Sequence, residues 1–256
     1  MTSIHPTALV DARAQLGDTV TVGPFSIIEA DVVIGDGTTI ASHALIANGA
    51  RIGKNCKIHK GAVVATIPQD LKFGFEETTF ESGDNTTIRE FCTLNRGTRE
   101  RGKSVVGANC LLMAYAHVAH DCHIGDNVIL ANCVQVAGHV DIEDQAIIGG
   151  LTGIHQFSRI GQHAMVGGGF RVHKDVPPYI LAMGEPLQYG GINSIGLRRR
   201  GFSAESMSAM KKAYRFIYRS HLNVSQAVEK IKAEMPETPE IQNILDFIDK
   251  AERGLI

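Results

Sequence analysis

Aliphatic residues recur at every sixth position along most of the chain. The longest uninterrupted series has twelve members: Val106, Leu112, Val118, Ile124, Leu130, Val136, Ile142, Ile148, Ile154, Ile160, Val166 and Val172. Chance does not produce such a run at ordinary composition, so the sequence repeats itself with a period of six. On a helix, that spacing would rotate the apolar residue steadily around the axis, whereas short two-sided strands keep it pointing inward. The pattern therefore predicts a solenoid of very short strands.

The same spacing begins near the first residue and is interrupted twice. It runs from Ile4 to Val64, weakens, and resumes at Val106. The interruptions at 65–79 and 95–105 are polar, so we expect them to leave the column as loops, where function is usually located. The whole pattern contains 26 hexads. Because three hexads close one coil, we expect a triangular parallel β-helix of eight to nine coils.

The last quarter of the chain has a helical pattern. The hexads end before the DVPPY segment, where two prolines remove backbone donors. Helix-capping residues then follow in three places: Ser203, Asn223 or Ser225, and Thr238 with Pro239. They predict helices to about Arg219 and Glu234 and a last helix that stops at Gly254. We therefore expect a β-helix over 1–190 and a small α-helical domain over 191–256, covering the open end or side of the column.

Composition and charge exclude several classes of protein. The net charge is only −2, so no overall field favours nucleic acid or membranes. The first residues lack a basic segment followed by an apolar run, and no 18-residue apolar stretch occurs, so we expect a cytoplasmic protein without membrane insertion. Four cysteines occupy the small corner slot of the repeat and are expected to be buried, reduced thiols: Cys56, Cys92, Cys110 and Cys122.

Histidines gather in one part of the repeat. They are His117, His120, His123, His139 and His155. Residues 18 apart stack about 5 Å apart on neighbouring coils, which aligns His120 with Gly138 and Gln156, and Asp121 with His139. A histidine that titrates near neutral pH can take a proton from a hydroxyl group, and an exposed glycine N–H can bind an oxyanion. This arrangement favours acyl transfer, although the histidines could also be hydrogen-bonded surface groups without a chemical role.

Other candidate sites are less specific. A zinc site would need His117, His120 and His123 to converge, but their spacing places them on different walls of one chain. In the first loop, Lys72 with Gln69 and Asp70 could reach a phosphate or sugar, or could simply be solvated. The segment 198–219 holds seven bases and one acid, which suits a diphosphate or an acidic protein, or an ordinary exposed helix face.

The hexads and several specific motifs together resemble one family over nearly the whole chain. The motifs are PQDLKF, NRGT, HVAHDC, ILAN, AGHV, AIIGG, HQF, DVPPY, GIN and GLRRRGFS, and the family is the bacterial UDP-N-acetylglucosamine O-acyltransferases. The resemblance implies a left-handed coil and a homotrimer with active sites in clefts between subunits. It also implies transfer of a 3-hydroxyacyl chain from acyl carrier protein to the 3-hydroxyl group of the UDP-sugar, the first step of lipid A synthesis. No metal and no bound cofactor are implied.

The resemblance also assigns roles to residues of this chain. It implies that His120 is the general base and that the Gly138 amide stabilises the oxyanion. The residues implied to bind substrate are Gln69, Asp70, Leu71, Lys72, His117, His139, His155, Gln156, Asn193, Arg199 and Arg200. We further expect Gly167, Gly168 and Gly169 to leave an open strip beside a hydrocarbon groove, with Gly168 as the acyl-chain ruler. The chain departs from the family pattern at Asn95, where a histidine is expected.

Two alternatives remain open from the sequence. Another hexapeptide acyltransferase would carry the same repeat, either the N-acyltransferase of the same pathway or an enzyme that uses acetyl-coenzyme A. The basic helical domain favours a carrier-protein donor over coenzyme A. A purely structural or binding solenoid is the other alternative, but it would need neither clustered histidines nor two polar loops.

Overall fold

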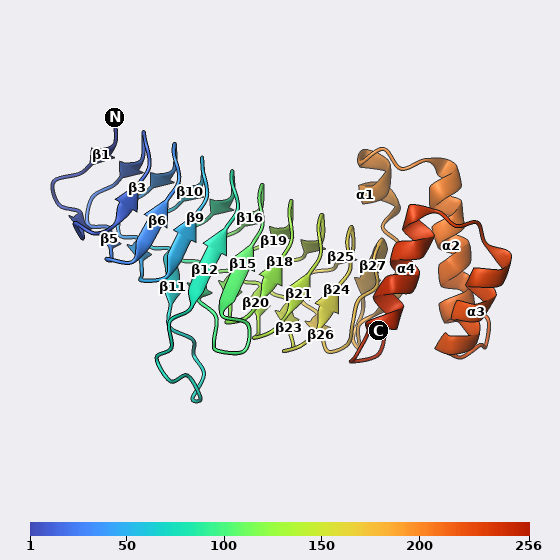
Figure 1. Ribbon diagram of the computed structural model, residues 1–256. Helices are drawn as coiled ribbons and strands as arrows, with labels where there is room; N and C mark the ends of the chain where they lie inside the picture. The colour runs from blue at the N-terminus through green and yellow to red at the C-terminus, as the bar shows by residue number, and fades with distance from the viewer.

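The computed structural model describes residues 1–256 as a long column of short strands that ends in a group of helices (Figure 1). The strands form three flat walls, and all strands of the column run parallel. Two loops hang from the middle of the column, and the four helices lie beyond its last coil (Figure 1). These features agree with a left-handed parallel β-helix followed by a helical domain.

The first sheet forms one wall and extends into the helical end. Its strands are, in spatial order, β1 (Ser3–Ile4), β4 (Thr21–Val22), β7 (Thr39–Ile40), β10 (Lys57–Ile58), β13 (Thr87–Ile88), β16 (Leu111–Leu112), β19 (Ile129–Leu130), β22 (Ile147–Ile148), β25 (Met165–Val166), β27 (Ile180–Met183) and β28 (Gln188–Ile192). Strand β28 pairs antiparallel with β27, so the parallel ladder ends there.

The second and third sheets complete the triangle. The second contains β2 (Leu9–Val10), β5 (Ile27–Ile28), β8 (Leu45–Ile46), β11 (Val63–Thr66), β14 (Thr93–Asn95), β17 (His117–Val118), β20 (Gln135–Val136), β23 (Gly153–Ile154) and β26 (Arg171–Val172). The third contains β3 (Gln15–Leu16), β6 (Val32–Ile34), β9 (Ala50–Ile52), β12 (Thr79–Ser82), β15 (Lys103–Val106), β18 (His123–Ile124), β21 (Asp141–Ile142) and β24 (Arg159–Ile160).

The six-residue period is confirmed, because successive hexads supply short strands whose aliphatic residue points inward along most of the column. All twelve aliphatic residues from Val106 to Val172 are at most 3% exposed. Neighbouring coils are in register at 18 residues, as His117 with Gln135 and Ile124 with Ile142 illustrate. Each wall therefore buries one side chain per strand and leaves the other outside, as the pleat requires.

The three edges of the prism differ in character. The aspartate edge, between the third and first sheets, carries aspartates whose carboxylates accept backbone N–H groups of the preceding coil: Asp126 caps Ala108 at 2.7 Å, and Asp144 caps Asp126 at 2.8 Å. The aromatic edge, between the first and second sheets, exposes stacked rings such as Phe91 on Tyr115. The histidine edge, between the second and third sheets, includes residues 119–122, 137–140 and 155–158.

Two interruptions of the repeat are loops, as predicted. The first loop spans 67–78, between β11 and β12, and the second spans 96–102, between β14 and β15. Both leave the column on the side of the histidine edge (Figure 1). The strands extend slightly further into these segments than the sequence pattern indicates.

The helical domain contains α1 (Ser194–Arg199), α2 (Ala204–Arg219), α3 (Val224–Glu234) and α4 (Pro239–Asp249). The predicted caps are confirmed, since Ser203, Asn223 and Thr238 each accept a backbone N–H of the helix that follows. The prediction that Gly254 ends the last helix was wrong: the helix ends at Asp249, and the residues after it return to the column, where Ile256 N–H donates to the Asp175 carbonyl. Helix α1 was not predicted individually.

The helical domain covers the end of the column. The hydroxyl of Tyr214, which is fully buried on α2, donates to the Pro178 carbonyl at 2.6 Å. The Arg159 guanidinium on β24 lies 4.5 Å from the centre of the Phe247 ring on α4. No helix combines the length and apolar character that a membrane crossing requires. The four cysteines of the corner slot are buried and unpaired, as expected.

Candidate active site

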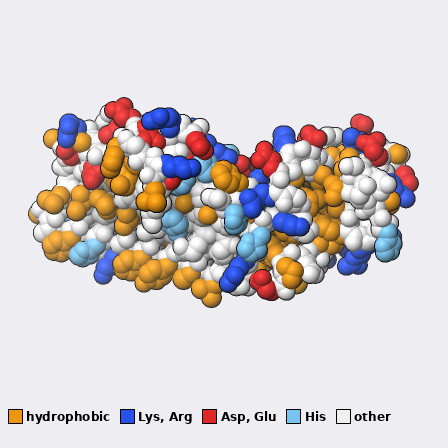
Figure 2. Space-filling model, turned by 90° about the horizontal axis from the view of Figure 1, so that it is seen from below, with side chains coloured by type: hydrophobic (Ala, Val, Ile, Leu, Met, Phe, Trp, Pro, Cys, Tyr) orange, Lys and Arg blue, Asp and Glu red, His pale blue; other side chains and the backbone are white.

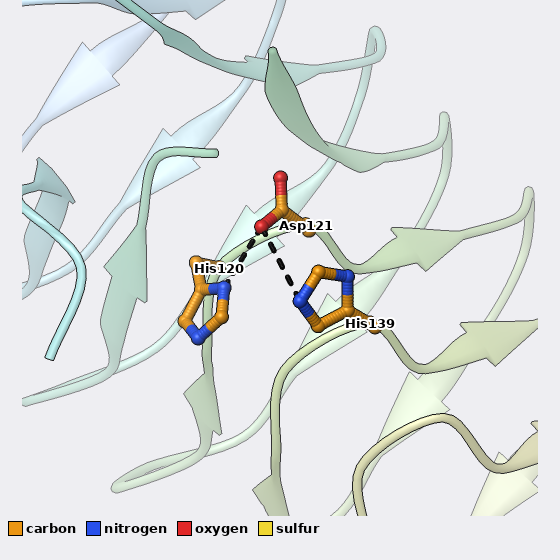
Figure 3. A group of neighbouring side chains, drawn as sticks. All are labelled: His120, Asp121 and His139. Atoms are coloured by element: carbon orange, nitrogen blue, oxygen red, sulfur yellow. Dashed lines mark hydrogen bonds and ion pairs between the residues drawn. The ribbon is translucent and has the colours of Figure 1, made fainter. Parts of the chain in front are cut away.

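The histidine edge brings His120, Asp121 and Gly138 into contact. His120 Nδ1 lies 2.8 Å from Asp121 Oδ2 (Figure 3). Because a carboxylate only accepts hydrogen bonds, this contact keeps the ring proton on Nδ1 and leaves the Nε2 lone pair free. A Cβ atom at Gly138 would lie 2.8 Å from His120 Cε1 and Nε2, so only glycine permits the ring to lie here.

Gly138 supplies a backbone donor beside this ring. Its N–H donates no hydrogen bond within the chain, whereas its carbonyl accepts one from Phe157 N–H. The residue itself is buried, because the His120 ring lies over it, and not exposed as expected from the sequence. The free imidazole nitrogen and the free amide thus lie next to each other on adjacent coils.

Asp121 is completely buried and has more than one donor. Thr98 N–H donates to Oδ1 at 2.9 Å, and the Thr98 hydroxyl donates to Oδ2 at 2.6 Å. Burial by itself raises the pKa of this carboxyl, but the hydrogen bonds from Thr98 and His120 outweigh it and hold the pKa below its usual range. Asp121 is therefore a carboxylate at neutral pH, able to orient the imidazole. Its supporting residue, Thr98, was not among the predicted site residues.

His139 packs against the same pair from the next coil. Its ring meets the His120 ring edge-on at 5.1 Å and stacks on Phe157 at 4.6 Å. Its Nε2 lies 3.4 Å from Glu100 Oε2 and 3.7 Å from Asp121 Oδ2. His120, Asp121 and His139 each offer one atom that could bind a metal ion, and these three atoms lie within 4.8 Å of one another. The contact between His120 and Asp121 already engages two of the three atoms.

A cleft of about 740 Å³ opens over these residues and contains most of the predicted substrate-binding set. Its lining includes Gln69, Asp70, Leu71, Lys72, His120, His139 and Gln156. The first loop forms one side of the cleft and the histidine edge forms the other. The structure thus brings together loop and column residues that are 48 to 87 positions apart in the sequence, a proximity that the period alone does not predict.

The first loop is held by side chains of the NRGT segment, 95–98. Asn95 is buried, and its amide donates to the Ile67 carbonyl at 3.0 Å and to Thr66 Oγ1 at 3.1 Å. The Arg96 guanidinium donates to the Asn48 carbonyl and lies over the Phe73 ring. Asn95 therefore anchors the root of the loop. In the sequence, Asn95 stood out only as a departure from the family pattern, and no role was predicted for it.

His117 and His155 lie in a neighbouring cleft on the second sheet. This cleft has a volume of about 750 Å³, and its lining also includes Leu151, Gly169 and His173. His117 Nδ1 lies 2.8 Å from the Thr93 hydroxyl, and burial lowers the pKa of His117, which keeps the ring neutral. The histidine side chains gather along this face between hydrophobic surfaces (Figure 2).

The structure corrects the expected open strip at the three glycines. A Cβ at Gly167 would lie 2.7 Å from the Phe170 ring, and one at Gly168 would lie 3.0 Å from the Gly150 carbonyl oxygen. Gly168 and Gly169 are both exposed, but only at Gly169 would a Cβ meet open space, and Gly169 alone of the three lines the second-sheet cleft. A larger side chain at Gly168 would press on the adjacent coil, so the structure does not support the open-strip argument for Gly168 as the acyl-chain ruler, and that role stays a prediction.

Asn193, Arg199 and Arg200 lie apart from the histidine edge. Asn193 caps α1 and donates to the carbonyl of His163, a residue of the aspartate edge. Arg199 is exposed, whereas Arg200 Nη1 is buried without a hydrogen-bond partner. Burial, followed by the charge of Arg200, lowers the pKa of His163 to about 4. Within one chain, these residues therefore cannot meet His120, because they occupy a different edge of the prism.

A basic cleft lies between α2 and β28. It has a volume of about 330 Å³, and its cationic lining consists of Lys211, Arg215 and Arg219 on one face of α2. None of the three forms an ion pair in this structure. Lys and Arg side chains gather where the column meets the helices (Figure 2). This cleft suits an anionic partner.

Comparisons with known proteins agree with the fold. The model for "Udp N-acetylglucosamine O-acyltransferase; Domain 2" matches residues 175–256, and that for bacterial transferase hexapeptide repeats matches 13–48, 32–66 and 103–138. A protein from Thiobacillus denitrificans is 49% identical over 257 residues and spans 100% of both chains. One from Paracidovorax citrulli is 53% identical, covering 100% of this chain and 99% of the other. Both are named acyl-[acyl-carrier-protein]--UDP-N-acetylglucosamine O-acyltransferase.

Solved structures give the same result. A UDP-N-acetylglucosamine acyltransferase from Bacteroides fragilis superposes with a TM-score of 0.97 at 49% identity, covering 98% of this chain and 99% of the other. The Francisella novicida UDP-N-acetylglucosamine acyltransferase superposes with a TM-score of 0.96 at 38% identity, covering 99% and 93%. Similarity at this level extends to both the column and the helical domain.

Proposed function

The chain belongs to the UDP-N-acetylglucosamine O-acyltransferase family, and on that premise we propose that it transfers a 3-hydroxyacyl chain from acyl carrier protein to the 3-hydroxyl group of UDP-N-acetylglucosamine. We further propose that it acts in lipid A synthesis in the cytoplasm. The observation that carries the proposal is the contact of His120, oriented by Asp121, with Gly138.

The proposed reaction uses His120 first as a base and then as an acid. His120 Nε2 accepts the proton of the sugar hydroxyl, whose oxygen attacks the thioester carbonyl carbon of the donor. The carbonyl oxygen becomes an oxyanion, and the Gly138 N–H donates a hydrogen bond to it. The tetrahedral intermediate then expels the carrier thiolate, which recovers the proton from His120. The products are the sugar ester and the free carrier thiol, and the reaction balances without a metal or cofactor.

The histidine and aspartate edges give a reason for a homotrimer. The residues proposed to bind the sugar nucleotide divide between the two edges, with Gln69 and Lys72 near His120, and Asn193 and Arg200 near His163. A second copy placed beside the first would bring the two groups into one cleft. Exposed apolar side chains of the aromatic edge, such as Tyr115 and Leu151, support such packing, because it would bury them.

The basic cleft of α2 supports a protein donor over coenzyme A. Lys211, Arg215 and Arg219 form a row on the helical domain without acidic partners, which fits an acidic carrier protein. The division of labour follows the two proposed domains. The column, 1–190, carries the chemistry, while the helical domain, 191–256, holds the donor and part of the sugar nucleotide.

The proposal is tested by direct assay of the purified protein. Acyl carrier protein thioesters of graded chain length are offered with UDP-N-acetylglucosamine, with its 3-amino analogue, and in parallel as coenzyme A thioesters. We expect ester formation from the carrier-bound 3-hydroxyacyl donors and the 3-hydroxyl acceptor. Amide formation on the amino sugar alone, or turnover only with coenzyme A, would favour one of the other hexapeptide acyltransferases. Absence of transfer with every pair would contradict the proposal.

A further inference from the structure

We propose that Thr98 is a positioning residue for the base: its N–H and hydroxyl fix the Asp121 carboxylate so that His120 keeps its proton on Nδ1 and presents Nε2. This inference deepens the proposed function and rests on it for the role of His120. Thr98 borders the cleft, but its hydroxyl is bonded to Asp121 and is not a reacting group. It acts through Asp121, from the second loop.

The contacts of Asp121 explain why a positioning residue is needed. Two histidines lie within reach of the same oxygen, His120 Nδ1 at 2.8 Å and His139 Nε2 at 3.7 Å. A carboxylate held only by His120 would be free to turn toward His139. Thr98 binds both carboxylate oxygens, Oδ1 through its N–H and Oδ2 through its hydroxyl, and so leaves the orientation toward His120 as the favoured one.

Thr98 is itself held rigidly, as a positioning residue requires. It is 7% exposed, and its carbonyl accepts the N–H of Gly102 at 2.8 Å. Its hydroxyl oxygen also accepts the Glu100 N–H at 3.3 Å, which directs the hydroxyl proton to Asp121. Gly97, one residue earlier, packs against the Lys103 backbone so closely that a Cβ would lie 2.3 Å from Lys103 N. Contacts on both sides of Thr98 therefore hold the second loop in place, and the loop in turn supports the Asp121 carboxylate.

Other ionisable groups around the pair are accounted for. Glu100 contacts His139, Arg101 donates to the Asp121 carbonyl and pairs with Asp141, and His117 lies three residues before His120 on the same coil. The cleft further contains Asp70, Lys72, Glu76 and Arg99. Among these side chains, only those of Thr98 and His120 hydrogen-bond to the Asp121 carboxylate, so removal of the threonine hydroxyl perturbs the pair selectively.

The test compares three variants of the full-length protein. Thr98→Val removes the hydroxyl at nearly constant shape, and Thr98→Ser retains it. Thr78→Val is the matched control, because the buried Thr78 hydroxyl makes an equally short bond, 2.6 Å, to the Gly97 carbonyl in the same segment without touching Asp121. For each variant, kcat is measured against pH, together with KM for UDP-N-acetylglucosamine and the thermal unfolding midpoint.

We expect Thr98→Val to lower the plateau kcat on the order of tenfold with little change in KM. Without the threonine hydroxyl, the carboxylate turns toward His139 part of the time and stabilises the protonated His120 imidazole less. The acidic limb of the kcat profile should therefore move to lower pH. Thr98→Ser should retain the wild-type profile, and Thr78→Val should change the unfolding midpoint without moving the limb.

Three outcomes would overturn the inference: an unmoved limb in Thr98→Val, equal damage in Thr98→Ser, or the same movement in Thr78→Val. Nitrogen NMR of the His120 ring provides a readout independent of turnover, with Nδ1 protonated in the wild type and a mixture of tautomers in Thr98→Val. It applies even if the wild-type protein transfers no acyl group, which would contradict the proposed function instead. If Thr98→Val does not fold, Thr98→Ala takes its place.

Discussion

The aspartate and histidine edges use the same hexads and the same residue types for different ends. Asp126 on the aspartate edge is exposed, and its carboxylate caps the Ala108 N–H of the preceding coil. Asp121 on the histidine edge is fully buried and binds Thr98 and His120 instead. One carboxylate holds two coils together, and the other orients an imidazole.

The difference comes from what packs over each edge. No loop leaves the repeat at the aspartate edge, so its carboxylates remain in solvent and bind the nearest unpaired amide. At the histidine edge the second loop, 96–102, covers Asp121, and the first loop, 67–78, closes the cleft over His120. Because burial makes an unpaired charge costly, Asp121 must be surrounded by donors, and these donors give it a defined direction.

The largest expected effect tests the histidine edge itself. His120→Ala should reduce kcat by about 100- to 10,000-fold, because it removes the proposed general base. The ring lies outside the packed column, so the thermal midpoint and the oligomeric state should be unchanged. Steady-state kinetics with a 3-hydroxyacyl carrier thioester measure the loss. Near-normal turnover in a folded variant would contradict the assignment of the base.

A matched pair of aspartate substitutions sharpens the comparison of the edges. Asp121→Ala should lower kcat at least about 100-fold, because the imidazole loses the partner that orients it. Asp126→Ala should leave kcat unchanged and lower the free energy of unfolding by about 0.5–1.5 kcal/mol, the usual contribution of one hydrogen bond. Denaturant unfolding and kinetics are measured on both. Similar kinetic losses in the two variants would mean that the edges do not divide the roles.

Substitutions of two arginines test whether the end of the aspartate edge is only structural. Arg200→Ala should raise KM for UDP-N-acetylglucosamine about tenfold, the effect of losing one charged hydrogen bond, with little change in kcat. Arg199→Ala should act in the same direction. Lys212→Ala, another exposed cation of the helical domain outside both clefts of the proposed site, is the control. An unchanged KM in both arginine variants would remove this edge from the sugar nucleotide site.

The smallest effect concerns stability against pH. Burial lowers the pKa of His163 from 6.5 to about 4, so the folded protein resists a proton that the unfolded chain accepts. Above pH 6.5 both states are neutral and His163 contributes nothing, but stability should fall as the pH drops from 6.5 to about 4. His163→Gln should flatten this part of the unfolding profile, whereas His221→Gln, at an exposed histidine, should not. Equal slopes in the two variants would exclude His163 as the cause.

The sequence predicted the column well because its signal is local and repeated. Every inward residue from Val106 to Val172 is buried, and the caps at Ser203, Asn223 and Thr238 begin helices as predicted. The pairing of His120 with Gly138 also follows from the period. The end of the last helix was misplaced, because glycine at 254 is a stop signal only if the helix extends that far, and packing against the column ends it at Asp249.

The six-residue period does not predict the arrangement of the loops. Nothing in the spacing indicates that Thr98 reaches Asp121 or that Asn95 anchors the first loop. Similarly, the three glycines at 167–169 look equivalent in sequence, yet their surroundings differ from packed to open. Such contacts depend on distances between residues on different coils, and the sequence pattern does not predict these distances.

By itself, the sequence determined the column: its period, its inward residues, and the alignment of an imidazole with a glycine one coil above. It could do so because neighbouring residues on a strand and neighbouring coils are both fixed by a count of residues. Only the tertiary structure decided which carboxylate is buried, what holds it, and that the two groups of residues proposed to bind substrate lie on separate edges of one chain. These depend on how non-repeating loops and helices pack, and each such contact is set by burial and hydrogen bonding at long range.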